Sequence, residues 1–150
     1  MKVRAMPIAG LLTLLVLMLT ACGDPASPAL ASASTNQGLP VLSRNAAGFM
    51  DLSVKQLAES MARKNFSLVN VHVPDLEKLP NTDLSIPFDQ ITANLDRLPG
   101  KDAPIVLYCR SGGMSTQAAA ALAAAGYTKI YELDGGFNAW KAAGHTILNK

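Results

Sequence analysis

A cysteine between an apolar run and an alanine-rich run is the feature that most constrains this chain. Residues 104–108 predict a short buried strand, and residues 116–125 predict a helix that ends at Gly126. Cys109 is therefore expected at the C-terminal end of a strand, in a glycine-containing loop before a helix. That edge of an open α/β sheet is where ligands bind. The loop amides and the helix dipole favour a bound anion, and they favour a thiolate over a thiol.

The number of cysteines limits the chemistry of this thiol. The chain has two, Cys22 and Cys109, and we expect the first to be lipidated. One thiol then remains, which excludes an intramolecular disulfide, CxxC redox exchange and a cysteine-rich zinc site. The alternative is a buried cysteine with only a packing role. Arg110 and the glycines that follow Cys109 at once favour the functional interpretation.

The first residues predict export. Two basic residues precede an apolar stretch over residues 8–19, which is too short for a comfortable membrane span. The sequence Leu-Thr-Ala-Cys at residues 19–22 resembles the bacterial lipobox, which implies cleavage before Cys22 and a diacylglyceryl group on its sulfur. The alternative is an ordinary secretory signal that is cut after the small residues 31–33. We expect a location in the cell envelope, lipid-anchored to a bacterial membrane at the periplasmic face or the cell exterior.

The chain divides into three predicted segments. Residues 1–21 are a lipoprotein signal peptide, residues 22–45 a lipidated cysteine and flexible tether, and residues 46–150 one folded domain. Removing the signal peptide takes away Lys2 and Arg4, which lowers the formal net charge from +2 to 0. The remaining chain has no basic cluster, so we expect contact with a membrane through the anchor and no binding of nucleic acid.

The order of the predicted elements indicates an α/β fold. Strands are expected over residues 67–73, 84–87, 104–108 and 129–133. Helices are expected over residues 54–63, 89–97, 116–125 and 137–143. A capping box at residues 53–56 is expected to begin the first helix, and Asp89 and Ser115 are expected to cap the second and third. Strands that alternate with helices predict a mostly parallel central sheet with helices on both faces.

Two signatures in this order resemble those of the rhodanese-like sulfurtransferase family. Residues 109–115 are similar to the family's active-site loop, and residues 133–140, Leu-Asp-Gly-Gly-Phe-Asn-Ala-Trp, are similar to its glycine turn and final helix. The resemblance covers residues 52–147 and implies a single rhodanese-like domain. It implies that Cys109 attacks a small anionic sulfur donor, such as thiosulfate or polysulfide, and carries the sulfur as a persulfide. The expected binding residues are Arg110, Ser111, Gly112, Gly113, Met114 and Ser115.

The chain departs from the family pattern at three places. Met114 stands where relatives often have Arg, Ser or Thr, which predicts weak affinity for thiosulfate. Asn70 and His72 replace an Asp and an Arg of the earlier strand, and residues 74–88 lack a segment that relatives share. One wall of the pocket is therefore expected to differ. His72 and His145 are expected to be structural or surface residues, and Trp140 to belong to the core.

Other functions remain as alternatives to the enzyme. A sulfur carrier would hold sulfane sulfur on Cys109 for a partner protein, with little turnover, whereas the enzyme would pass it to a small thiol, cyanide or a partner protein. A phosphatase or arsenate reductase of the same fold would need an arginine where Ser115 stands. No cofactor is expected. Two histidines and one thiol do not predict a metal site.

Overall fold

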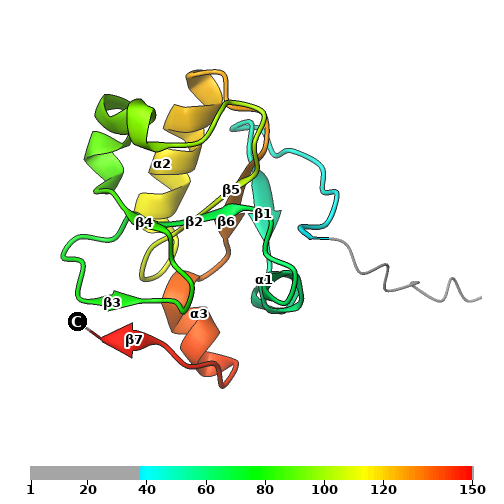
Figure 1. The fold of residues 1–150 in the computed structure, drawn as a ribbon, viewed down its shortest axis with the longest axis vertical. Coiled ribbons are helices and arrows are strands. Elements are labelled where there is room, and N and C mark those ends of the chain that lie inside the picture. Colours follow the sequence, from blue (N-terminus) through cyan, green and yellow to red (C-terminus); the bar gives the residue numbers. More distant parts are fainter. Residues whose placement is uncertain (1–37, 150) are drawn as a thin grey trace, which may run out of the picture. The chain divides into compact units, whose positions relative to one another are not determined.

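The computed structural model describes residues 38–149, and a parallel β-sheet forms their centre (Figure 1). Five strands follow the order β1-β6-β5-β2-β4, and all neighbouring pairs are parallel. The strands are β1 (Met50–Leu52), β2 (Ser67–Asn70), β4 (Leu84–Ser85), β5 (Ile105–Tyr108) and β6 (Ile130–Leu133). The structure thus confirms the predicted α/β domain with a mostly parallel central sheet.

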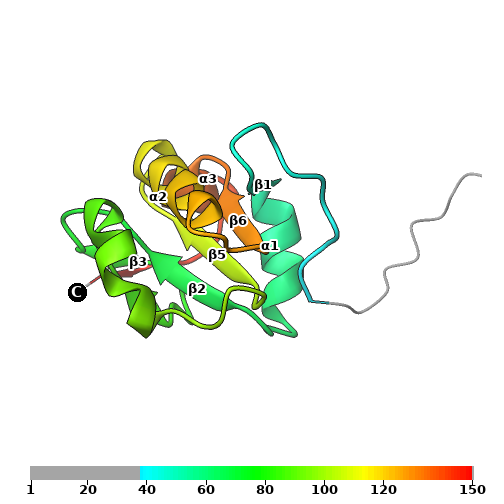
Figure 2. The ribbon, with the colours of Figure 1, turned by 90° about the horizontal axis from the view of Figure 1, so that it is seen from above.

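Helices cover both faces of this sheet, which Figure 1 shows edge-on, and Figure 2 looks down on one of the two helix layers. The helix α2 (Gly113–Ala124) and the 3-10 helix η1 (Phe88–Arg97) pack on one face. The helices α1 (Val54–Met61) and α3 (Gly136–Ala142) pack on the other. Each central strand is buried on both sides, which explains why residues 105–108 form a continuous apolar run.

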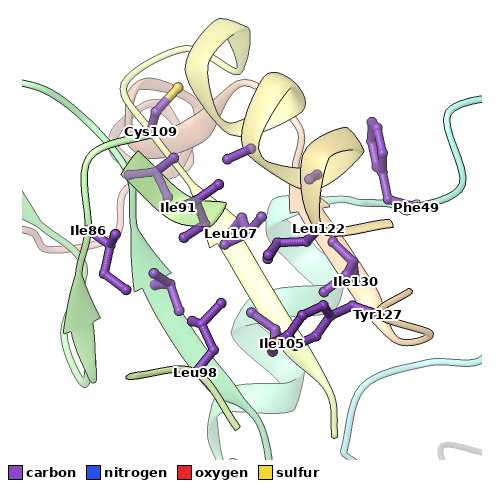
Figure 3. Packing of buried hydrophobic residues seen from close by; sticks show 14 residues of the cluster. Phe49, Ile86, Ile91, Leu98, Ile105, Leu107, Cys109, Leu122, Tyr127 and Ile130 are labelled. Atoms are coloured by element: carbon purple, nitrogen blue, oxygen red, sulfur yellow. The ribbon is translucent and has the colours of Figure 1, made fainter. Parts of the chain in front are cut away.

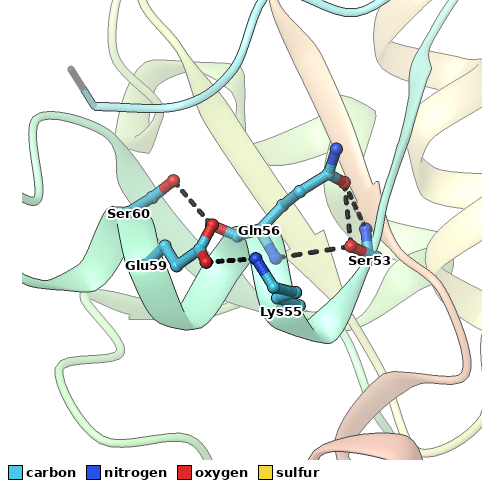
Figure 4. A network of polar contacts seen from close by, with 5 residues as sticks. All are labelled: Ser53, Lys55, Gln56, Glu59 and Ser60. Atoms are coloured by element: carbon cyan, nitrogen blue, oxygen red, sulfur yellow. Dashed lines mark hydrogen bonds and ion pairs between the residues drawn. The ribbon is translucent and has the colours of Figure 1, made fainter. Parts of the chain in front are cut away.

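A capping box begins α1, as the sequence predicts (Figure 4). The amide of Gln56 donates to Oγ of Ser53 over 3.3 Å, and the amide of Ser53 donates to Oε1 of Gln56 over 2.9 Å. These two bonds satisfy amides that a helix start leaves without partners. On the exposed face of the same helix, Lys55 forms an ion pair with Glu59 one turn later.

The segment between β2 and β5 differs from its prediction in two ways. Asp89 is not the helix cap, because Pro87 occupies that position with φ of −49° and Asp89 lies exposed in the first turn. The helix begins at Phe88, whose amide donates to the carbonyl of Val71 over 3.1 Å. In addition, β3 (Glu77–Lys78) pairs antiparallel with β7 (Leu148–Asn149), which the sequence analysis does not predict.

Residues 38–45, which the sequence analysis assigns to the tether, contact the domain. Tyr131 donates its hydroxyl hydrogen to the carbonyl of Pro40 over 3.1 Å, and Arg44 donates to the carbonyl of Thr128 over 2.6 Å. Leu39 and Leu42 pack against the core on the α1 face. The folded domain thus includes this segment, which we call the N-terminal strap (residues 38–45).

The predicted signal peptide and the predicted lipidation site Cys22 lie outside the described residues. Within residues 38–149, no helix combines the length and the apolar character that crossing a bilayer requires.

Candidate active site

Cys109 follows directly after β5, at the C-terminal edge of the sheet. Its side chain is buried, with 2% of its surface exposed, and it ends the cluster of apolar residues that packs under α2 (Figure 3). It is the one free cysteine among residues 38–149. The predicted position of the thiol, between a strand and a helix N-terminus, is therefore the position it occupies.

Several donors converge on the sulfur of Cys109. The amide of Gly112 lies 3.2 Å from Sγ, and the hydroxyl of Ser115 lies 3.3 Å from it. Burial alone would raise the pKa of the thiol. Hydrogen bonds from the Ser115 hydroxyl and from the amides of Ser111, Met114 and Ser115 outweigh that effect and lower the pKa below its ordinary value. The loop thus stabilises a thiolate.

The helix after the loop begins earlier than predicted, and this changes the role of Ser115. Gly112 is the N-cap of α2, with a φ of +103° that favours glycine. Ser115 is therefore not the N-cap. It lies in the first turn, fully buried, and its hydroxyl also approaches the carbonyl of Gly112 over 3.0 Å. The glycine turn places this hydroxyl beside the sulfur rather than over the free amides of the helix.

The other predicted loop residues form the rim of the site. Arg110, Ser111 and Gly113 are exposed, whereas Met114 is half-buried and packs against the core under α2. Met114 contributes packing and no charge beside the sulfur.

The second signature holds the cysteine loop through the backbone. The amide of Phe137 donates to the carbonyl of Cys109 over 3.0 Å, and the amide of Asn138 donates to the carbonyl of Arg110 over 3.0 Å. Gly136 permits this approach, because a Cβ there would lie 2.2 Å from the carbonyl oxygen of Cys109. The two signatures, separate in the sequence, thus form one structural unit.

Glu132 is a site residue that the sequence analysis does not identify. It lies in β6 with 3% of its surface exposed, and Ser115 donates to its Oε1 over 2.5 Å. Burial raises the pKa of Glu132 to about 7 against the hydrogen bond from Ser115, which lowers it, and the nearby carboxyl groups of Asp134 and Asp51 add to the rise. The signal in the sequence is an acidic residue in the middle of a strand that is otherwise apolar.

Arg110 lies in a small pocket beside α3. The pocket has a volume of about 170 Å³, and its lining residues are His72, Pro74, Leu76, Glu77, Arg110 and Phe137. Burial lowers the pKa of His72, and the charge of Arg110 lowers it further. Arg110 is not among the groups that lower the pKa of Cys109. The structure thus brings Arg110 together with His72 rather than with the thiol.

The remaining aromatic and histidine predictions agree with the structure. Trp140 is buried with 5% of its surface exposed, and its Nε1 donates to the carbonyl of Thr146 over 2.9 Å. The ring of His145 packs on Trp140 with 4.3 Å between centroids. His72 packs edge-on against Phe137 with 5.4 Å between centroids. These contacts explain both histidines as packing residues.

The sequence matches a known protein family. The family model described as "Rhodanese-like domain" matches residues 53–143. Thiosulfate sulfurtransferase GlpE of Shewanella oneidensis is 34% identical over 98 residues, which cover 63% of this chain and 95% of that protein. A sulfurtransferase of Allochromatium vinosum is 40% identical over 65 residues, which cover 43% of this chain and 60% of that protein.

Solved structures share the fold. The rhodanese-like domain of an Anabaena protein superposes with a TM-score of 0.61 at 20% identity, covering 67% of this chain and 79% of that chain. Thiosulfate sulfurtransferase from Pseudomonas aeruginosa superposes with a TM-score of 0.58 at 25% identity, and the match covers 67% of this chain and 20% of that chain.

Proposed function

The chain belongs to the rhodanese-like domain family, and we propose that it transfers sulfane sulfur from an anionic donor to a nucleophilic acceptor through a persulfide on Cys109. The observation that carries the proposal is the convergence of the Gly112 amide and the Ser115 hydroxyl on Sγ, at 3.2 and 3.3 Å. These donors stabilise negative charge on sulfur, which both a thiolate and a persulfide require.

The proposed reaction has two displacement steps. The thiolate of Cys109 attacks the outer sulfur of thiosulfate or a polysulfide. An S–S bond forms to Cys109, and the bond within the donor breaks with its electron pair, releasing sulfite or a shortened polysulfide. An acceptor such as cyanide, a small thiol or a protein thiolate then attacks the outer sulfur of the persulfide and regenerates the thiolate. No oxidant or reductant is consumed beyond the donor and the acceptor.

The loop residues supply electrostatic stabilisation in this scheme. The amides of residues 110–115 hold the negative charge of the donor and the persulfide near the start of α2. Arg110 attracts the anionic donor to the rim, where its side chain is exposed. Ser115 donates to the sulfur from inside the protein, and Met114 closes the site against the core without adding charge.

A sulfur carrier is the second candidate. It is favoured by the burial of Cys109, of which 2% is exposed, and by the uncharged Met114 beside it. A persulfide in such a site is protected from bulk thiols and is released to a partner protein that approaches the rim. The third possibility, a phosphatase or arsenate reductase, is disfavoured because a buried serine stands where that chemistry needs an arginine.

Mass spectrometry of the mature chain tests these functions. The protein is incubated with thiosulfate or polysulfide, its intact mass is measured, and cyanide is then added. Gain of one sulfur atom that cyanide discharges, with repeated turnover on thiosulfate, is the expected result. Gain from polysulfide alone without turnover would identify the carrier. Unchanged sulfur loading in a folded Cys109→Ser variant would contradict the mechanism.

We further propose that the protein is a lipoprotein of the cell envelope, anchored through Cys22. The support is the lipobox-like sequence at residues 19–22 after an apolar stretch. Cys22→Ser in the full-length chain is expected to leave an unprocessed precursor that takes up no labelled palmitate. Palmitate labelling of that variant at the wild-type level would exclude the anchor.

A further inference from the structure

Cys109 and Glu132 compete for the same hydrogen-bond donor. The hydroxyl of Ser115 lies 3.3 Å from Sγ of Cys109 and 2.5 Å from Oε1 of Glu132. The carbonyl of Gly112, at 3.0 Å, is a third acceptor. A serine hydroxyl has one hydrogen and can donate it to one acceptor at a time. The three side chains are all buried, with exposures of 2% for Cys109, 3% for Glu132 and 0% for Ser115. Solvent is therefore a poor substitute for either interaction.

We propose that Cys109, Ser115 and Glu132 form one proton-sharing unit, in which Glu132 controls, through Ser115, whether the negative charge lies on sulfur or on carboxylate. The inference rests on the proposed role of Cys109 as the nucleophile. Glu132 acts here as a positioning residue, because its contact with the sulfur passes through Ser115. Nothing in the sulfur displacement itself requires a carboxyl group, so the role is an addition to that chemistry.

The two forms of the unit differ by a shift of two protons. In one form the Cys109 thiol donates to Oγ of Ser115, and the Ser115 hydroxyl donates to the Glu132 carboxylate. In the other form the Glu132 carboxyl donates to Oγ of Ser115, and the Ser115 hydroxyl donates to the Cys109 thiolate. Each form carries a single negative charge, and no proton enters or leaves the unit. The second form is the reactive one, because its sulfur is ionised.

The surroundings of Glu132 make the second form accessible near neutral pH. Asp51 of β1 is its register partner, Asp134 follows β6, and the carboxyl oxygens of these three residues lie within 4.8 Å of one another. Burial is the main cause that raises the pKa of the Glu132 carboxyl to about 7; the hydrogen bond from Ser115 opposes it, and the acidic neighbours Asp134 and Asp51 add to the rise. The pKa of the Cys109 thiol is lowered. Because the pKa values of the two groups move toward each other and both contact the Ser115 hydroxyl, we expect the pair to titrate as a unit.

The pH dependence of alkylation tests the proposal without any sulfur donor. The rate constant for reaction of Cys109 with iodoacetamide, an uncharged reagent, is measured from about pH 5 to about pH 10 and reports the thiolate fraction. In the wild-type protein the rate is expected to rise in two steps, because the unit loses two protons and its first ionisation is shared. Glu132→Gln has an amide that donates permanently to Ser115, so its rate is expected to rise in one step. At neutral pH the variant is expected to react about 2- to 10-fold faster than the wild type.

A double-mutant cycle identifies the path of the coupling. In a Ser115→Ala background the contact between Glu132 and the sulfur is lost, so adding Glu132→Gln is expected to change the profile by less than about 1.5-fold. Asp134→Asn serves as the control, because it removes a neighbouring charge and leaves the Ser115 contact in place. Its profile is expected to keep two steps.

Circular dichroism first establishes that the variants are folded, so that changes in the alkylation rate report on Cys109. Overlapping profiles of the wild type and Glu132→Gln would overturn the proposal. An effect of Glu132→Gln that persists in Ser115→Ala would also overturn it, because the coupling would then act through space. A one-step profile for Glu132→Gln together with no sulfur loading from any donor would leave the proton-sharing unit standing and reject the sulfurtransferase function.

Discussion

The amide of Phe137 donates to the carbonyl oxygen of Cys109 over 3.0 Å. This bond attaches the start of α3 to the residue that carries the candidate nucleophile. Gly136, the first residue of α3, directly precedes Phe137 and has a φ of +56°. The glycine signature thus stabilises the cysteine loop through backbone hydrogen bonds.

Substitution of Gly136 is expected to damage the loop more than backbone strain alone can explain. In Gly136→Ala, the new Cβ would lie 2.2 Å from the Cys109 carbonyl oxygen and 2.8 Å from the Arg110 carbonyl carbon. Gly144→Ala is the matched control, because Gly144 has φ of +84° and nothing within 4 Å of a new Cβ. We expect a loss of about 1–2 kcal/mol for the control and at least about 3 kcal/mol for Gly136→Ala in urea unfolding. Equal losses would show that the approach to Cys109 is not the constraint.

The sequence predicts four of the five strands of the central sheet and the position of the thiol, because their signals are local, but it does not predict β1. Residues 105–108 are an uninterrupted apolar run, and Cys109 is followed within three residues by the first of the two turn glycines. Ser115 is different, because a serine before an alanine-rich run also matches a helix cap. Only the positive φ of Gly112 shows that the helix has begun by Gly113.

The site features that no local sequence pattern predicts depend on distant contacts. Glu132 is buried because β6 lies between β1 and β5 while α2 covers it, an arrangement that no local pattern contains. The segment after β2 is similar. Its Leu79 amide and Thr82 hydroxyl meet the hydroxyl of Tyr108 at 3.0 and 2.6 Å, so a residue of β5 organises a loop that is irregular in sequence.

Glu132 is expected to make stability depend on pH. Its folded-state pKa of about 7 lies above the ordinary value of 4.5, so the folded protein holds this proton more tightly than the unfolded chain. The resulting stability is fully present below about pH 4.5 and is lost as the pH rises through 7. We therefore compare the free energy of unfolding of Glu132→Gln with that of the wild type. The difference is expected to shift in favour of the variant by about 1–3 kcal/mol between about pH 5 and about pH 8. Urea unfolding at both pH values measures this, and a difference independent of pH would contradict it.

Arg110 is expected to control the ionisation of His72. Burial lowers the pKa of His72 first, and the positive charge of Arg110 adds to this effect, whereas Glu77 opposes it. Arg110→Ala should therefore raise the pKa of His72 toward its ordinary value, and Glu77→Gln should lower it further. Proton NMR of the imidazole during a pH titration measures both shifts. Movement of the two variants in the same direction would show that charge is not the cause.

The N-terminal strap is expected to contribute to folding stability. Leu42 packs against the core on the α1 face, whereas the adjacent Val41 is 98% exposed. Complete burial of an apolar side chain stabilises the folded state by about 1.5–3 kcal/mol. Because Leu42 is partly buried, Leu42→Ser is expected to lower the free energy of unfolding by about 1–2 kcal/mol. Val41→Ser is the matched control and is expected to stay within about 0.5 kcal/mol of the wild type. Both are measured by urea unfolding, with the wild-type chain alongside. Equal stabilities for the two variants would mean that the packing of Leu42 does not stabilise the folded domain. The prediction that the domain begins at residue 46 would then stand.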